Sequence, residues 1–316
     1  MKKMHPIKTA SIYVLYYLSV IIEFVVNPIF WFQILFQNIG QVVITVRCKF
    51  AGKEKNDAPE IVMSLPFVGT WQALAGDVTP KKSHSWYAVT QRYAYDLVAV
   101  DDEGQVHSGR GTKLDQYYTW GREVLAPADG EVVQVVDGNR DKQCPRSGWI
   151  GLWTRDFRGN FVIIRHTENR FSFLAHFQKG SITVRKGDTV RQGDRLGLAG
   201  NSGHTTEPHV HFHVQDRANF YLANGVPIRF RNFSRKTEDE KQPNAISEGY
   251  ITNESLIAPL PEGAEGQIED KVEIPGISIT DLLYSVIMAA CFVYAIQSLI
   301  DSYLDLVNYL VKLATG

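Results

Sequence analysis

Residues 200–214 read GNSGHTTEPHVHFHV, and this stretch decides the fold. His209, His211 and His213 stand two residues apart in an apolar run, and alternate residues of a β-strand project from the same face. Pro208 and the glycines before it are typical of a loop that leads the chain straight into a strand. The stretch therefore predicts a strand with its first two imidazoles at the strand mouth, where a metal and a general base become neighbours.

A histidine triplet alone also fits a polar stripe on a surface strand, so the surrounding sequence has to decide. The informative segments, in chain order, are YAYD (93–96), WGREVLAPADGEVV (120–133), GNFVII (159–164), the run 173–203 that begins FLAHFQKGS, and PHVHFHV (208–214). Together and in this order they resemble the lysostaphin/LytM family of zinc endopeptidases, which cut peptide bonds in bacterial peptidoglycan. The resemblance covers about residues 71–233.

The resemblance implies roles for four residues. Asp96 and His211, the second histidine of the H-x-H pair, match the family's zinc ligands, while His176 and His209 match its catalytic histidines. A catalytic Zn²⁺ usually keeps three protein ligands of the histidine and carboxylate type and leaves a fourth position for water. A neutral imidazole beside that water takes its proton and later returns it to the leaving amine.

One ligand of the family is missing, because the position four residues before Asp96 holds Arg92, which stays protonated and offers no lone pair. Either the site is inactive or another histidine fills the gap. His84 is our candidate for the third ligand, since the short run up to Asp96 predicts a hairpin or tight loop beside the strand of the aspartate. The alternative is an exposed loop histidine. Arg92 either binds a substrate carboxylate or oxyanion or forms a surface salt bridge, and His213 is expected to form hydrogen bonds deeper in the groove.

Composition narrows the class of partner. The formal net charge is −1, so no large basic field attracts this chain to nucleic acid. The three cysteines, Cys48, Cys144 and Cys291, are far apart and form no C-x-x-C pair, which argues against a disulfide framework or a cysteine zinc site.

Both ends of the chain are hydrophobic. Residues 282–300 are nearly free of charge and about as long as a bilayer core requires, which predicts a C-terminal transmembrane helix. Residues 10–36 contain Glu23 and the pair Asn27-Pro28, so they fit a kinked span, a re-entrant hairpin or an interfacial helix. We expect an uncleaved anchor there, and an amphipathic tail after residue 301.

The expected fold is mainly β, an antiparallel β-sheet groove domain flanked by N- and C-terminal membrane helices. Short alternating runs predict strands, with turns between them, at 131–136, 161–165, 171–176, 183–185 and 209–214. The expected division is an anchor (1–46), a LytM-like peptidase domain (47–233), a linker or extended wrap (234–276) and the C-terminal helix with its tail (277–316). The linker is charged and poor in large apolar residues, although residues 250–260 are able to add a strand.

These features predict a zinc metalloendopeptidase anchored in the cytoplasmic membrane of a bacterium, with its peptidase domain outside, where peptidoglycan lies. Peptidoglycan peptides and the lipid bilayer are the expected partners, besides membrane or cell-wall proteins. The rival hypothesis, motivated by Arg92, is a catalytically degenerate domain that binds cell wall or regulates a partner hydrolase. A membrane scaffold with neither metal nor peptidoglycan affinity is a third reading.

Overall fold

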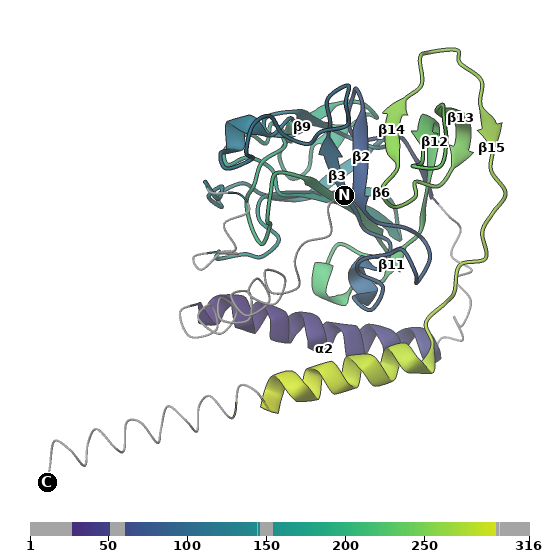
Figure 1. Ribbon diagram of the computed structural model, residues 1–316. Coiled ribbons are helices and arrows are strands. Elements are labelled where there is room, and N and C mark those ends of the chain that lie inside the picture. The colour runs from purple at the N-terminus through teal and green to yellow at the C-terminus, as the bar shows by residue number, and fades with distance from the viewer. Residues whose placement is uncertain (1–26, 51–60, 144, 146–153, 295–296, 298–316) are drawn as a thin grey trace, which may run out of the picture.

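The computed structural model describes residues 27–50, 61–143, 145, 154–294 and 297. Most of its strands belong to one 13-stranded sheet, whose main path runs β15-β13-β12-β14-β2-β3-β10-β7-β6-β5-β8 (Figure 1). Strand β1 joins it beside β12 and β11 beside β10, while β4 and β9 form a separate pair. The strands are β1 (Ile61–Met63), β2 (Trp71–Ala75), β3 (Tyr95–Ala99), β4 (Glu123–Leu125), β5 (Gly130–Val136), β6 (Phe161–Thr167), β7 (Arg170–Ala175), β8 (Thr189–Val190), β9 (Arg195–Leu198), β10 (Val210–Gln215), β11 (Gly225–Val226), β12 (Ile228–Lys236), β13 (Asn244–Gly249), β14 (Leu256–Pro259) and β15 (Gln267–Ile268).

The centre of the sheet positions the histidine strand. Every residue of β7 and of β10 is buried, because both faces of these strands are covered. One face packs into the main core, which includes Leu174 and Phe212, and the other carries Phe173 and the histidines. The antiparallel register sets His211 opposite Asp96 of β3 on one side and opposite Ala175 of β7 on the other. A mainly β fold with a large, largely antiparallel sheet is thus confirmed.

Four of the five expected strands are present as β5, β6, β7 and β10. The strand expected at 183–185 is wrong. Thr183 forms one backbone hydrogen bond, from its N–H to the Leu196 carbonyl at 2.8 Å, and no ladder continues from it. Alternating side chains alone did not provide a pairing partner for this run.

Residues 234–276, expected as a linker or extended wrap, contain more regular structure than that. The end of β12 and the strands β13, β14 and β15 extend the sheet on the β2 side. Ile246, Ile251 and Ile257 of this segment are buried in the main core, and their burial stabilises strands whose charged neighbours face solvent. The expectation of a linker is corrected here, while the other domain boundaries stay predictions.

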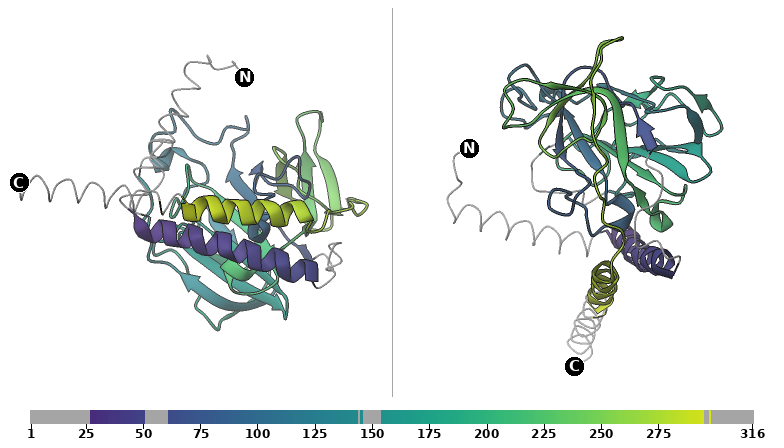
Figure 2. Two further views of the ribbon diagram at one scale, coloured as in Figure 1. Left: turned by 90° about the horizontal axis from the view of Figure 1, so that it is seen from below. Right: turned by 90° about the vertical axis from the view of Figure 1, so that its right-hand side faces the viewer.

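Two helices lie side by side along one face of the sheet domain (Figure 2). They are α2 (Pro28–Phe50) and the C-terminal helix (Ile279–Tyr294), and Trp31 of the first stacks on Phe292 of the second with ring centroids 5.4 Å apart. Short 3₁₀ turns lie near them at η1 (Val89–Gln91) and η3 (Phe220–Leu222), and η2 (Leu114–Gln116) lies elsewhere.

Helix α2 fits closely against the domain. Gly40 faces the Tyr221 carbonyl so closely that a Cβ there would lie 1.9 Å from its oxygen, so only glycine permits this approach. Arg47 forms an ion pair with Asp216 at 2.8 Å, and the Gln41 side chain accepts a hydrogen bond from the Val89 N–H at 3.1 Å. The side of α2 that faces the domain therefore includes polar groups that bind it.

The membrane predictions are only partly supported. In the described part of the chain, Ile29–Phe50 is the one helix long and apolar enough to cross a membrane by length and composition. The C-terminal helix over 279–294 is shorter, and a C-terminal span over 282–300 is not shown. Residues 1–26, the whole of the predicted tail after residue 301, and Cys144 lie outside the described residues.

Candidate metal and catalytic site

A cleft of about 350 Å³ opens where β3, β7 and β10 meet the loops between them. Its lining includes Asp96, His176, His209 and His211 together with His84. The structure thus brings together all five residues that the sequence singled out for catalysis or metal binding, from segments more than 100 positions apart.

Asp96 is the hub of this cluster. Its Oδ1 lies 2.9 Å from His211 Nδ1 and 3.7 Å from His209 Nε2, and its Oδ2 lies 3.4 Å from His84 Nε2. Burial alone would raise the pKa of Asp96, but the surrounding imidazoles of His209, His211 and His84 outweigh burial and hold that pKa well below its usual range. A carboxylate that stays ionised among imidazole nitrogens is a strong ligand for a divalent cation.

His84 reaches the site from the loop that precedes η1, about a third of its side chain being exposed. Ser83 and Ser85 fix this loop, since their hydroxyls donate to the carbonyls of Arg92 and Gln91 at 2.7 and 2.5 Å. Burial lowers the pKa of His84, against the opposing charge of Asp96, which favours the neutral form that a metal requires. His84 therefore lies where a third ligand is needed, and its role as one stays a prediction.

His176 follows β7 with a positive φ of 68°, a backbone conformation that is costly for a residue other than glycine. The turn is held by Ser202, whose hydroxyl donates to the Phe177 carbonyl at 2.7 Å and accepts from the Asn160 N–H at 2.9 Å. His176 Nδ1 donates to the Ser202 carbonyl at 2.7 Å, which leaves Nε2 as the bare nitrogen. Burial, with the nearby imidazoles, lowers the pKa of His176 well below its ordinary value.

His209 is oriented in the same way. Its Nδ1 lies 2.8 Å from the Glu207 carbonyl and 3.1 Å from Thr205 Oγ1, so Nδ1 carries the proton and Nε2 is bare. The rings of His176 and His209 are 4.6 Å apart. Two imidazoles with their acceptor nitrogens free are thus adjacent to the Asp96 cluster, as proton acceptors must be.

Behind the site, hydrogen bonds continue along β10. His211 Nε2 lies 3.1 Å from His213 Nδ1, and His213 Nε2 lies 3.0 Å from Gln215 Oε1. His213 is fully buried and stacks on Phe173, with ring centroids 4.9 Å apart. Burial, with the nearby His211, lowers the pKa of His213 to about 3. His213 therefore lies deeper in the groove than His211, in hydrogen-bond contact with it, as the sequence predicted.

Arg92 takes no part in the cleft. It is 2% exposed, and its guanidinium forms an ion pair with Asp281 at 2.7 Å, while Nε donates to the Trp86 carbonyl at 3.0 Å. The guanidinium also lies over the Trp86 ring, 4.5 Å from its centroid. Asp281 and Ser278 form a reciprocal cap at the start of the C-terminal helix. Both sequence-based interpretations of Arg92, substrate contact and surface salt bridge, are corrected to a buried ion pair that anchors this helix.

The donor set suits zinc in kind, with a carboxylate between two imidazoles. No group of three or more His, Cys, Asp or Glu side chains is already arranged as a metal site in the residues that the structure describes. Instead, His84 and His211 each contact Asp96 through the atoms that would bind the ion. The residues fit Zn²⁺ in chemistry, and binding would replace these mutual contacts by contacts to the cation.

Sequence reasoning missed one wall of the cleft. Phe30, Ile34 and Gln37 of α2 line it, and Phe30 stacks on His204 with ring centroids 5.4 Å apart. These residues lie in the segment, residues 1–46, that the sequence predicted to be a membrane anchor. Its polar residues at 27, 33, 37 and 41 were the available signal, because they recur on one side of a helix.

Part of this chain resembles known peptidases. Residues 107–228 match the model of peptidase family M23. An uncharacterised metalloprotease of Haemophilus influenzae is 31% identical over 36% of this chain and 20% of its own length. The peptidoglycan DD-endopeptidase ShyA of Vibrio cholerae is 37% identical over 30% of this chain and 24% of its own. The chain thus spans about a fifth to a quarter of the length of these two relatives.

Among solved structures, the catalytic domain of the antimicrobial peptidase lysostaphin from Staphylococcus simulans is 17% identical, with a TM-score of 0.27. It covers 50% of this chain and 88% of its own. The family assignment therefore rests on the sequence match, which includes His176, His209 and His211 and begins after Asp96 and His84. Within this chain, residues 107–228 are thus the part that matches peptidase family M23.

Proposed function

We propose that this protein is a membrane-associated zinc endopeptidase that hydrolyses peptide bonds of peptidoglycan. The single observation that carries the proposal is the convergence of His84, Asp96 and His211 beside two imidazoles whose acceptor nitrogens are free. The M23 match and the name of ShyA, a peptidoglycan DD-endopeptidase, support peptidoglycan as the substrate.

His84, Asp96 and His211 would hold the ion, which supplies a polarised, acidified water and a Lewis acid for the scissile carbonyl. His176 and His209 then act on protons. Their bare Nε2 atoms accept the proton of the attacking water and, once protonated, donate to the leaving amine or to the developing oxyanion. The carbonyls of Ser202 and Glu207 hold the two rings in the tautomer that this step needs.

We infer that α2 lies along the bilayer surface. Its polar side chains face the domain, while its opposite side carries an apolar stripe at three- and four-residue intervals. The stripe residues are between 46% and 89% exposed: Ile29, Phe32, Phe36, Ile39, Val43 and Phe50. The sequence directly before α2, residues 10–26, is also mostly apolar, so the stripe continues an apolar stretch. Because α2 also lines the cleft, this orientation holds the site close to the membrane.

The enzymatic part is tested with the full chain in detergent. Wild-type protein and His211→Ala are incubated with purified peptidoglycan, released fragments are identified by mass spectrometry, and bound zinc is measured by elemental analysis. Near-stoichiometric zinc and new peptide termini with wild type alone support the proposal. Equal hydrolysis by both proteins refutes it, and a zinc-free wild type that binds peptidoglycan without cutting it identifies a binding module instead.

The membrane part is tested with spin labels on a chain whose cysteines are replaced by serine. A label at position 36 should become inaccessible to a water-soluble relaxation reagent when lipid vesicles are added. A label at Val68, which is also exposed but lies before β2, serves as the control and should stay accessible. Equal accessibility of both labels contradicts the inference, as does protection that depends on protein concentration without vesicles, which would indicate a second copy of this chain.

A further inference from the structure

The hydrogen bonds behind His211 run in one direction, and Gln215 sets that direction. Its amide nitrogen Nε2 donates to the Arg217 carbonyl at 2.8 Å and lies 3.4 Å from the Ala218 carbonyl. If the amide were turned around, its oxygen would face two carbonyl oxygens, so the oxygen Oε1 has to point toward His213. Gln215 thus offers His213 only an acceptor.

The consequence passes through both imidazoles. His213 Nε2 lies 3.0 Å from Gln215 Oε1 and must carry the proton, which leaves Nδ1 of a neutral His213 as an acceptor. That Nδ1 lies 3.1 Å from His211 Nε2, so His211 also carries its proton on Nε2. Its Nδ1 lies 2.9 Å from Asp96 Oδ1, a contact that is a hydrogen bond only when a second proton sits on Nδ1. A metal ion bound between these two atoms would take the place of that proton.

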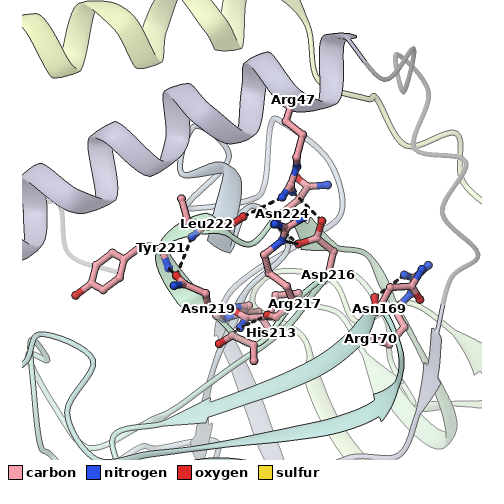
Figure 3. A network of polar contacts seen from close by, with 12 residues as sticks. Arg47, Asn169, Arg170, His213, Asp216, Arg217, Asn219, Tyr221, Leu222 and Asn224 are labelled. Atoms are coloured by element: carbon pink, nitrogen blue, oxygen red, sulfur yellow. Dashed lines mark hydrogen bonds and ion pairs between the residues drawn. The ribbon is translucent and has the colours of Figure 1, made fainter.

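Several polar contacts hold the turn that orients Gln215. The two carbonyls that orient Gln215 belong to the turn after β10, and Figure 3 shows that turn in a network of polar contacts. Asp216 accepts a hydrogen bond from the Asn224 N–H and an ion pair from Arg47 of α2, both at 2.8 Å. Asn219 caps η3 by accepting from the N–H groups of Tyr221 and Leu222. Gln215 itself is fully buried, so water does not compete for its amide.

We propose that Gln215 and His213 are positioning residues, which fix the tautomer of His211 so that its Nδ1 lone pair is presented to the metal. The inference rests on the proposed zinc site, but the tautomers exist independently of catalysis. The test variant is Gln215→Leu, which keeps the side-chain volume and removes the amide oxygen that accepts from His213. Ser172→Ala is the matched control, since Ser172 is equally buried, lies on the neighbouring β7, and has its hydroxyl 2.9 Å from His166 Nε2, away from the Gln215–His213–His211 contacts.

The first readout is nitrogen-15 NMR of the full chain in detergent, which distinguishes protonated from bare imidazole nitrogens. In metal-free wild type and in Ser172→Ala, His213 should be protonated on Nε2 alone. In Gln215→Leu, the two tautomers of His213 should mix. An unchanged His213 tautomer in Gln215→Leu overturns the proposal, and this arm is decided whether or not the protein binds zinc.

The second readout is zinc affinity, measured by competition with a chelator. Gln215→Leu should weaken binding by about 10- to 100-fold, the usual effect of removing a group that orients a ligand. The His213→Asn variant keeps an acceptor oxygen where Nδ1 lies in wild type, so it should bind zinc nearly as wild type does. The His213→Leu variant has no acceptor and should lose zinc affinity as Gln215→Leu does. Equal zinc affinity of His213→Asn and His213→Leu refutes the proposed positioning roles. A wild type that binds no zinc instead refutes the proposed function.

Discussion

The two sides of the cleft are built by opposite strategies. On the β10 side, His209 and His211 lie within the match to family M23, and the strand register, β7 and buried hydrogen bonds fix them. On the β3 side, Asp96 lies outside that match and contacts a loop histidine, His84, while Arg92 lies outside the cleft in a buried ion pair. Neighbouring strands constrain β10 on both sides, whereas a loop alone positions His84.

The largest effect should come from His176, which follows β7 and lies beside His209. His176→Ala removes one of the proposed proton acceptors while leaving the ligand set intact, so kcat on peptidoglycan peptides should fall by about 10²- to 10⁴-fold. Zinc content, measured on the same samples, should not change. A loss of zinc together with activity would show that His176 is a metal ligand, which would contradict its proposed role as a proton acceptor.

Arg92→Ala tests whether Arg92, which precedes β3, stabilises the fold. The change leaves Asp281 buried without its cation, so the free energy of unfolding should fall by about 3–5 kcal/mol, as for other buried pairs that lose one partner. Urea unfolding at neutral pH measures it. Arg47→Ala, which breaks a more exposed pair with Asp216, should cost much less. Similar small losses for both variants would mean that the Arg92 pair contributes little.

His84→Ala tests the replacement ligand. Zinc affinity should fall by more than about 10-fold, because even groups that only support a ligand have effects of that size. Exchange of the neighbouring loop residue Lys82, which is exposed, for Ala is the control and should leave zinc affinity unchanged. If His84→Ala binds zinc as wild type does, a group other than His84 completes the site, and the loop on the β3 side does not supply a ligand.

Per pH unit, the smallest effect concerns His213, the buried histidine on the β10 side. Burial and the nearby His211 lower the pKa of His213 to about 3 in the folded protein, from about 6.5 when unfolded. Between these two pH values the unfolded chain binds one more proton at this position than the folded protein does. The free energy of unfolding therefore falls as pH drops below 6.5, at about 1.4 kcal/mol per pH unit. Urea unfolding of metal-free protein at several pH values from 7 to about 4 measures the slope. His213→Asn should flatten it, and an equal slope in both proteins contradicts the assignment.

Sequence reasoning reached the histidine strand more fully than the rest of the site. The H-x-H-x-H run and the strand periodicity predicted that strand, and the resemblance of the ordered segments to a known family nominated His176, His209, His211 and Asp96. The proximity of His84 to Asp96 followed from a short loop. The ion pair of Arg92 joins positions 92 and 281, and the α2 wall joins positions 30 and 204. Contacts between such distant segments depend on packing that no local pattern encodes.

The strands in residues 234–276 show the same limit. Their composition is charged, and the few isoleucines become meaningful only beside β2 and β12, which bury them. The ordering of this segment depends on a neighbour that the segment itself does not specify.

The ion pair between Arg92 and Asp281 couples position 92 to the start of the C-terminal helix. A histidine at position 92 would leave Asp281 without a counter-charge there and would lose the contact that the guanidinium makes with the Trp86 ring. Because the loss of either partner alone passes through a less stable protein, positions 92 and 281 are expected to change together in evolution.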